Sequence, residues 1–79
     1  MKIERVQTGV RMEKQLVKVL KGTAEYLDMS LGDLLEGIVL HAFDGNDPVF
    51  SNETRAKIAA LKNIYGCTLD ASVSHRLTE

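Results

Sequence analysis

The chain has 79 residues, a net charge of −1 at pH 7 and one cysteine. A chain of this length folds as one small domain, whose core is marginal unless a disulfide, a metal or a partner subunit adds stability. A lone cysteine excludes an intrachain disulfide and is typical of a reducing compartment. Cys67, His41 and His75 lack the spacing of metal ligands, so we predict no metal site and no cofactor. Oligomerisation is the remaining source of stability.

Membrane, secretory and enzymatic functions find no support in the sequence. No stretch approaches the roughly 20 apolar residues of a membrane span, and the charged start Met-Lys-Ile-Glu-Arg lacks the apolar centre of a signal peptide. The chain has no Gly-rich phosphate loop, no nucleophile elbow and no metal-binding spacing. We therefore expect a soluble, cytoplasmic protein that has no membrane partner and is not an enzyme.

The charges are segregated along the chain. Residues 1–22 carry six Lys or Arg against two Glu, a net charge of +4, whereas residues 23–50 carry six acidic residues and no Lys or Arg. Residues 51–79 have a net charge of +1. A phosphate-binding surface requires such a basic region. The overall charge of −1 argues against a nucleic-acid binder, and the charges of a solvated surface can also segregate by chance.

Residues 5–11, Arg-Val-Gln-Thr-Gly-Val-Arg, are the best candidate for a β-strand. In a strand, Val6, Thr8 and Val10 would share one face, with Met12 just beyond, and this face is suited to burial. The opposite, polar face would hold Arg5, Gln7, Gly9 and Arg11. No convincing second strand exists in the chain to satisfy the N–H and C=O groups of the first. We therefore expect the strand to pair with another copy of the chain in a homodimer.

Apolar residues at a spacing of about 3.6 predict three helices, over residues 13–27, 31–43 and 52–64. The second helix has the clearest start, because Ser30 can cap it and Asp33 follows three residues later, as in a capping box. Ser51 or Asn52 is expected to cap the third helix, and Gly66 to follow its end. Residues 67–79 have apolar residues at four-residue spacing, which is compatible with a short fourth helix.

The second predicted helix is apolar over more than one stripe. The residues expected to be buried are Leu31, Leu34, Leu35, Ile38, Val39, Ala42 and Phe43. Leu40 adds to them. Because one neighbouring helix cannot cover so wide a surface, we expect this helix to pack against both the first helix and the second helix of a partner chain.

This order of strand, helix and Ser-capped second helix resembles the ribbon-helix-helix family of bacterial repressors, which includes Arc and the methionine repressor. The resemblance covers residues 5–43, and its most specific part is residues 27–35, Leu-Asp-Met-Ser-Leu-Gly-Asp-Leu-Leu, similar to the family turn Leu-Gly-x-Ser-x-x-Glu-Leu-Ile. It implies a mainly α, ribbon-helix-helix dimer with one N-terminal β-strand per chain and an additional C-terminal helix. Residues 1–45 would form the DNA-binding and dimerisation domain, and residues 46–79 a C-terminal helical extension packing on the same core.

In that family, strands from two subunits pair and enter the major groove of DNA. The resemblance implies that Gln7, Gly9 and Arg11 are the base-reading positions here, with Arg5 near the end of the ribbon. Arg can pair with guanine O6 and N7, and Gln with adenine N6 and N7. Gly9 puts no side chain at the centre of this face, so recognition would depend on its neighbours and on DNA shape.

The family also binds a DNA phosphate at the start of its second helix. The resemblance carries this role to Ser30, Leu31 and Gly32, because free N–H groups and the helix dipole favour an anion there. Gly32 leaves room for a phosphate. The charge of Asp33 would repel one unless that carboxylate is engaged in capping.

We therefore expect a homodimeric, sequence-specific transcriptional repressor of bacterial type, with double-stranded DNA as its partner. The alternative is a dimeric protein-interaction module, or an antitoxin, in which residues 52–65 bind a partner protein. In the module, the polar face of residues 5–11 would be only the solvated side of the ribbon.

Overall fold

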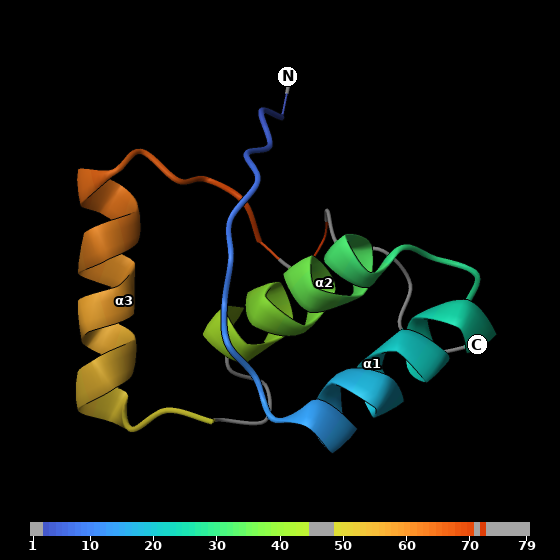
Figure 1. The fold of residues 1–79 in the computed structure, drawn as a ribbon. Helices are drawn as coiled ribbons and strands as arrows, with labels where there is room; N and C mark the ends of the chain where they lie inside the picture. Colours follow the sequence, from blue (N-terminus) through green and yellow to red (C-terminus); the bar gives the residue numbers. More distant parts are fainter. Residues whose placement is uncertain (1–2, 45–48, 71, 73–79) are drawn as a thin grey trace.

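The computed structural model describes residues 3–44, 49–70 and 72 of the chain. The described part is mainly α, with the helices α1 (Lys14–Tyr26), α2 (Leu31–Asp44) and α3 (Asn52–Ile64), as Figure 1 shows. These bounds confirm the three helices predicted from the apolar spacing to within one residue at each end. No helix among the described residues combines the length and the apolar character needed to cross a membrane.

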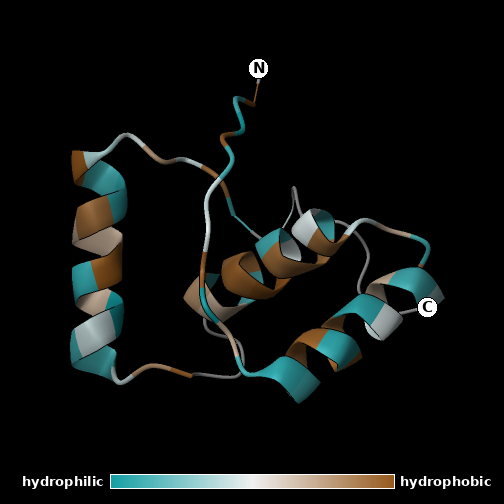
Figure 2. Ribbon diagram, viewed as in Figure 1, coloured by the Kyte–Doolittle hydropathy of each residue, from teal (hydrophilic) through white to brown (hydrophobic). Residues whose placement is uncertain are grey.

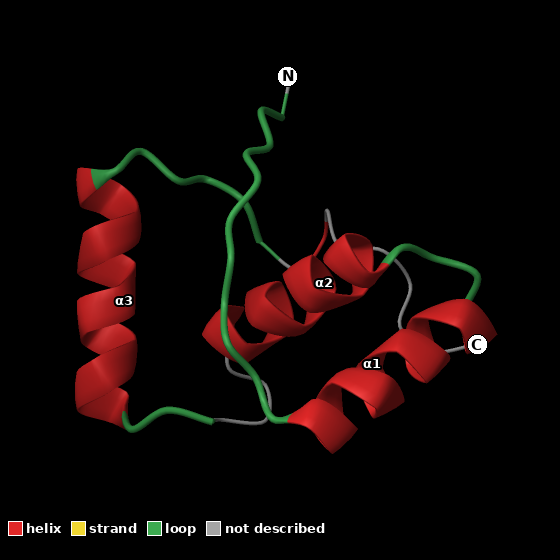
Figure 3. Ribbon diagram, viewed as in Figure 1, coloured by secondary structure: helices red, strands yellow, loops and turns green. Residues whose placement is uncertain are grey.

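The β-strand predicted at residues 5–11 is wrong, because the described residues contain no strand (Figure 3). Residues 3–13, here called the arm, run as a loop that leads into α1. The expected burial of one face is also missing, since Val6 is 81% exposed and Val10 is 72% exposed. A strand requires a neighbour to bond its N–H and C=O groups, and the described part of this chain supplies none. The predicted ribbon-helix-helix fold class, with one strand per chain, is therefore corrected to a mainly α fold of helices and connecting loops.

Glu13 caps the start of α1. Its carboxylate accepts hydrogen bonds from the backbone N–H of Leu16, at 2.8 Å, and from that of Gln15, at 2.9 Å. Because the backbone N–H of Gln15 and then that of Leu16 stabilise the charged form, they lower the pKa of Glu13. The cap satisfies N–H groups that have no partner inside the first turn of the helix.

Helices α1 and α3 end in the same way. Asp28 follows α1 at φ 57°, and the next N–H, that of Met29, donates to the Ala24 carbonyl at 2.9 Å. Gly66 follows α3 at φ 66° and confirms the predicted glycine after that helix. This left-handed turn satisfies the last carbonyls of a helix, and glycine adopts it at the lowest cost.

Serine side chains set the starts of α2 and α3, as predicted. The Asp33 N–H donates to Ser30 Oγ at 3.1 Å, and the Thr54 N–H donates to Ser51 Oγ at 3.2 Å. Both bonds supply acceptors to N–H groups that the helix itself leaves open. The local residues therefore determine where these helices begin.

The core lies between α1 and α2, which pack side by side (Figure 1). Its buried hydrophobic side chains, among the described residues, are those of Ala24, Leu34 and Leu40. Gly37 is also buried and lies between the two leucines along α2. The spacing of three residues keeps these α2 positions on one side of the helix.

Ile38, Val39 and Phe43, which the sequence predicts to be buried with the help of a partner chain, are exposed in the single chain, with Ile38 at 42% and Val39 at 45%. Each residue along a helix is turned by about 100° from the last, so positions 38 and 39 point away from the stripe that meets α1. Hydrophobic residues recur along most of α2 (Figure 2). Helix α2 therefore has a second apolar face that the described part of the chain leaves half-buried or exposed.

Helix α3 lies apart from the pair formed by α1 and α2 (Figure 1), and none of its residues is buried. Extensive contact between described helices is confined to α1 and α2. Residues 67–70 form no helix, and Val73 and Leu77 of the predicted fourth helix lie outside the described residues. The packing of residues 46–79 on the core stays a prediction.

Candidate functional site

The base-reading positions predicted from the sequence lie on the arm. Gln7, Gly9 and Arg11 are all exposed. Within the described part of the chain, neither the Gln7 amide nor the Arg11 guanidinium has a hydrogen bond or an ion pair. A Cβ atom built at Gly9 would meet no heavy atom within 4 Å. This stretch of the arm is open to a ligand from solvent.

Arg5 forms an ion pair with Glu36, a residue that the sequence did not indicate as part of a site. Its Nη2 donates to Glu36 Oε1 at 2.9 Å, and its Nε donates to Glu36 Oε2 at 3.1 Å. The hydrogen bonds from Arg5 to Glu36, then the negative charge of Glu36 and that of Asp33, raise the pKa of Arg5. The two partners are 31 residues apart in sequence, so no local signal could have brought Glu36 into the site.

A row of lysines on α1 continues the positive charge that begins at Arg11. Lys14, Lys18 and Lys21 are exposed and stand at helical spacing on one side of the helix. Arg11 precedes Lys14 by three residues. We call these four residues the basic row. Its side chains are suited to phosphate, because lysine provides a mobile point charge and arginine a planar fork.

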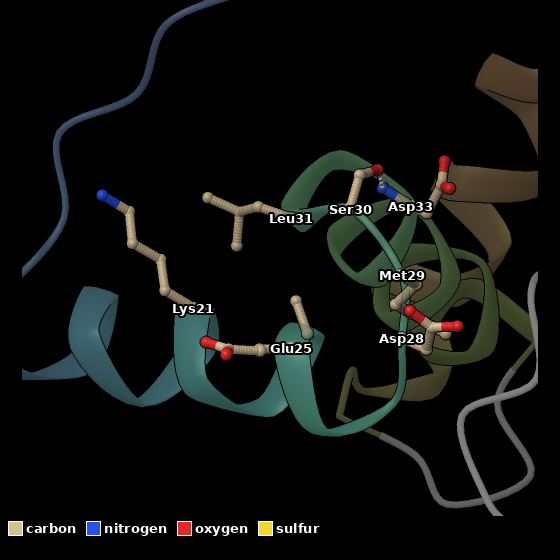
Figure 4. A pocket seen from close by; sticks show the side chains of 8 residues that line it. Lys21, Glu25, Asp28, Met29, Ser30, Leu31 and Asp33 are labelled. Carbon is tan, nitrogen blue, oxygen red and sulfur yellow. Dashed lines mark hydrogen bonds between the residues drawn. The ribbon is translucent and has the colours of Figure 1, made fainter.

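The predicted phosphate-binding residues lie beside a cleft of about 580 Å³ at the turn between α1 and α2 (Figure 4). The described residues that line it are Lys21, Ala24, Glu25, Asp28, Met29, Ser30, Leu31 and Asp33. Ser30 Oγ already accepts the Asp33 N–H. A Cβ atom at Gly32 would have Ser30 Oγ at 3.9 Å as its nearest neighbour, so there is room beside the first turn of α2.

The charge of this cleft opposes the binding of a phosphate. Among the described residues of the lining, Lys21 is the only cation, whereas Glu25, Asp28 and Asp33 supply three carboxylates. Figure 4 shows Lys21 and Glu25 on α1, opposite the start of α2 where Ser30 and Asp33 lie. Like charges repel an anion even where a helix N-terminus attracts it. The phosphate-binding role of Ser30, Leu31 and Gly32 stays a prediction.

The structure therefore brings the start of the arm to α2 and leaves the middle of the arm in solvent. No family model, curated protein or solved structure matches this chain. The resemblance to the ribbon-helix-helix family stays a prediction. Among residues 3–44, 49–70 and 72, no group of three or more His, Cys, Asp or Glu is placed to hold a metal ion.

Proposed function

We propose that this protein is a homodimeric DNA-binding transcriptional regulator, acting as a repressor, that contacts DNA with the arm and the basic row. One observation carries the proposal. Gln7 and Arg11 are exposed without partners in the described chain, and they lead directly into the lysines of α1.

The side chains of this surface support both kinds of contact that a regulator needs. The lysines of the basic row neutralise phosphates, which gives affinity without sequence preference. Arg11 supplies a fork for guanine and Gln7 an amide for adenine, and such contacts give specificity. The element that meets DNA in this proposal is the irregular arm of the structure, not a strand.

The uncovered apolar surface supports a dimer. The buried hydrophobic core of the described chain is small for a chain of this length, which favours association. The second face of α2 carries Leu31, Leu35, Ile38, Val39 and Ala42, which are half-buried or exposed. Two copies of this face, packed against each other, would remove them from water. Two-fold symmetry would also present the arm twice, once from each subunit, as a pseudo-palindromic site requires.

DNA binding is tested with fluorescent duplexes taken from the DNA upstream of the gene for this protein, titrated at two salt concentrations. Affinity should fall with salt with a log–log slope of about −0.9 per neutralised phosphate. The Arg11→Ala variant should lose about 1–3 kcal/mol at a preferred guanine. Arg55→Ala on α3 is the matched control, because it removes the same charge away from the arm. Equal losses in the two variants, or no binding at low salt, would exclude the proposal.

The dimer is tested by sedimentation equilibrium. Ile38→Asp places a charge on the second face of α2 and should convert the dimer to a folded monomer, because Ile38 does not belong to the buried contact with α1. Val49→Asp changes an exposed residue outside the helices and should leave the dimer intact. A wild-type chain that sediments as a folded monomer at micromolar concentration would exclude the dimer.

A protein-interaction module, or an antitoxin, is the second candidate, and α3 favours it. This helix lies apart from the core with the apolar side chains of Leu61, Ile64 and Tyr65 exposed at its end. A partner protein could cover them. Absence of DNA binding at low salt, together with a dimer that survives, would select the module over the regulator.

A further inference from the structure

The pairing of Arg5 with Glu36 joins the arm to the middle of α2. The guanidinium meets the carboxylate through two hydrogen bonds, of 2.9 Å and 3.1 Å, which is the forked geometry that arginine also uses for phosphate. The Arg5 side chain is 50% exposed and that of Glu36 is 34% exposed. The pair is therefore accessible to solvent and to a ligand that approaches the arm.

The neighbourhood of Arg5 is more acidic than that of Arg11. Asp33 lies one turn before Glu36 on α2, and its charge adds to the attraction for the Arg5 guanidinium. Arg11 has no such partner among the described residues. Two arginines of one arm thus have different electrostatic roles, although the sequence places both on the same polar side.

We propose that Glu36 is a positioning residue that holds the arm against α2 through Arg5 and keeps the Arg5 guanidinium from DNA phosphates. The inference rests on the proposed function. It assigns the DNA contacts of the arm to Gln7 and Arg11, and makes Arg5 the anchor of the arm. A carboxylate on the same chain competes well with a phosphate, because it is always present at the guanidinium.

The first experiment measures the arm without DNA. In the ¹⁵N-labelled protein, the heteronuclear NOE of residues 6–9 reports fast motion of the backbone. Glu36→Gln should lower these values, because the anchor is lost. The control is Glu53→Gln, which makes the same change of charge on α3 and should leave the arm unchanged. If Glu36→Gln also leaves the arm unchanged, the inference is overturned whatever the protein does with DNA.

The second experiment measures the salt dependence of binding to a fluorescein-labelled duplex. In Glu36→Gln, the freed Arg5 should reach a phosphate, so the log–log slope should steepen by about 0.9 per protomer. Adding Arg5→Ala to this variant should return the slope to the wild-type value. Glu53→Gln should raise affinity slightly through its charge but keep the slope, because it creates no new contact.

The two experiments separate the failure of the inference from the failure of the proposed function. If Glu36→Gln and Glu53→Gln have the same slope, Glu36 does not withhold Arg5 and the inference is wrong, while DNA binding stands. If no variant binds the duplex but Glu36→Gln loosens the arm, the proposed function fails, and the DNA part of the inference fails with it. The anchoring of the arm by Glu36 would then be supported alone.

Discussion

Leu34 is the most deeply buried side chain of the core, and its truncation tests whether the contact of α1 with α2 stabilises the fold. The side chain is 2% exposed. Leu34→Ala removes three carbon atoms, which costs about 2.4 kcal/mol at about 0.8 kcal/mol per CH₂ group. A cavity that does not collapse would raise the loss toward about 5 kcal/mol.

This loss is large relative to the stability that such a chain can have. At roughly 0.05–0.15 kcal/mol per residue, a domain of this size has a free energy of unfolding of about 4–12 kcal/mol. With a urea dependence of about 1–2 kcal/mol per molar, the midpoint of unfolding should fall by about 1–2 M. Circular dichroism in urea measures this midpoint. The protein concentration must be the same for each variant, because the stability of a dimer depends on it.

Leu61→Ala is the matched control for Leu34→Ala. Leu61 is exposed on α3, so its truncation should change the free energy of unfolding by no more than about 0.5 kcal/mol. Equal shifts of the urea midpoint in the two variants would refute the reasoning, because the stability would then not come from the stripe that α2 turns toward α1.

Three further predictions concern the ends and the interior of the helices. Ser30→Ala removes the cap of α2 and should lower the free energy of unfolding by about 1 kcal/mol in urea titrations. Gly66→Ala forces a side chain into φ 66° and should lower the free energy of unfolding by about 1–2 kcal/mol. Gly22→Ala, inside α1 with nothing within 4 Å of the new Cβ, should raise it by about 1 kcal/mol. Stabilisation by Gly66→Ala would contradict the left-handed turn. The backbone N–H of Gln15, and then that of Leu16, lower the pKa of Glu13 from its ordinary 4.5. The stability that these two hydrogen bonds add is therefore complete above about pH 4.5, and it is lost as the pH falls through the lowered pKa. Helicity measured by circular dichroism should therefore fall more on acidification in the wild type than in Glu13→Gln, and identical pH profiles would exclude this cap.

The helices of this protein could be predicted from the sequence because their signals are local. A serine accepts an N–H three residues away, and a glycine after a helix adopts the left-handed turn, so the groups involved are always close along the chain. Ser30, Ser51 and Gly66 do what their positions predict. The apolar spacing likewise indicates that α2 has more hydrophobic surface than one neighbour covers.

Only the tertiary structure decided which face of α2 is buried, which backbone conformation the arm adopts and which residue pairs with Arg5. Leu34 and Leu40 meet α1 while Ile38 and Val39 stay exposed, because one neighbouring helix covers one stripe. The arm has the alternation of a strand, but a strand forms only where another chain segment bonds its backbone. Arg5 and Glu36 are neighbours across 31 positions of sequence, and a pattern of nearby residues carries no information about such a distant partner.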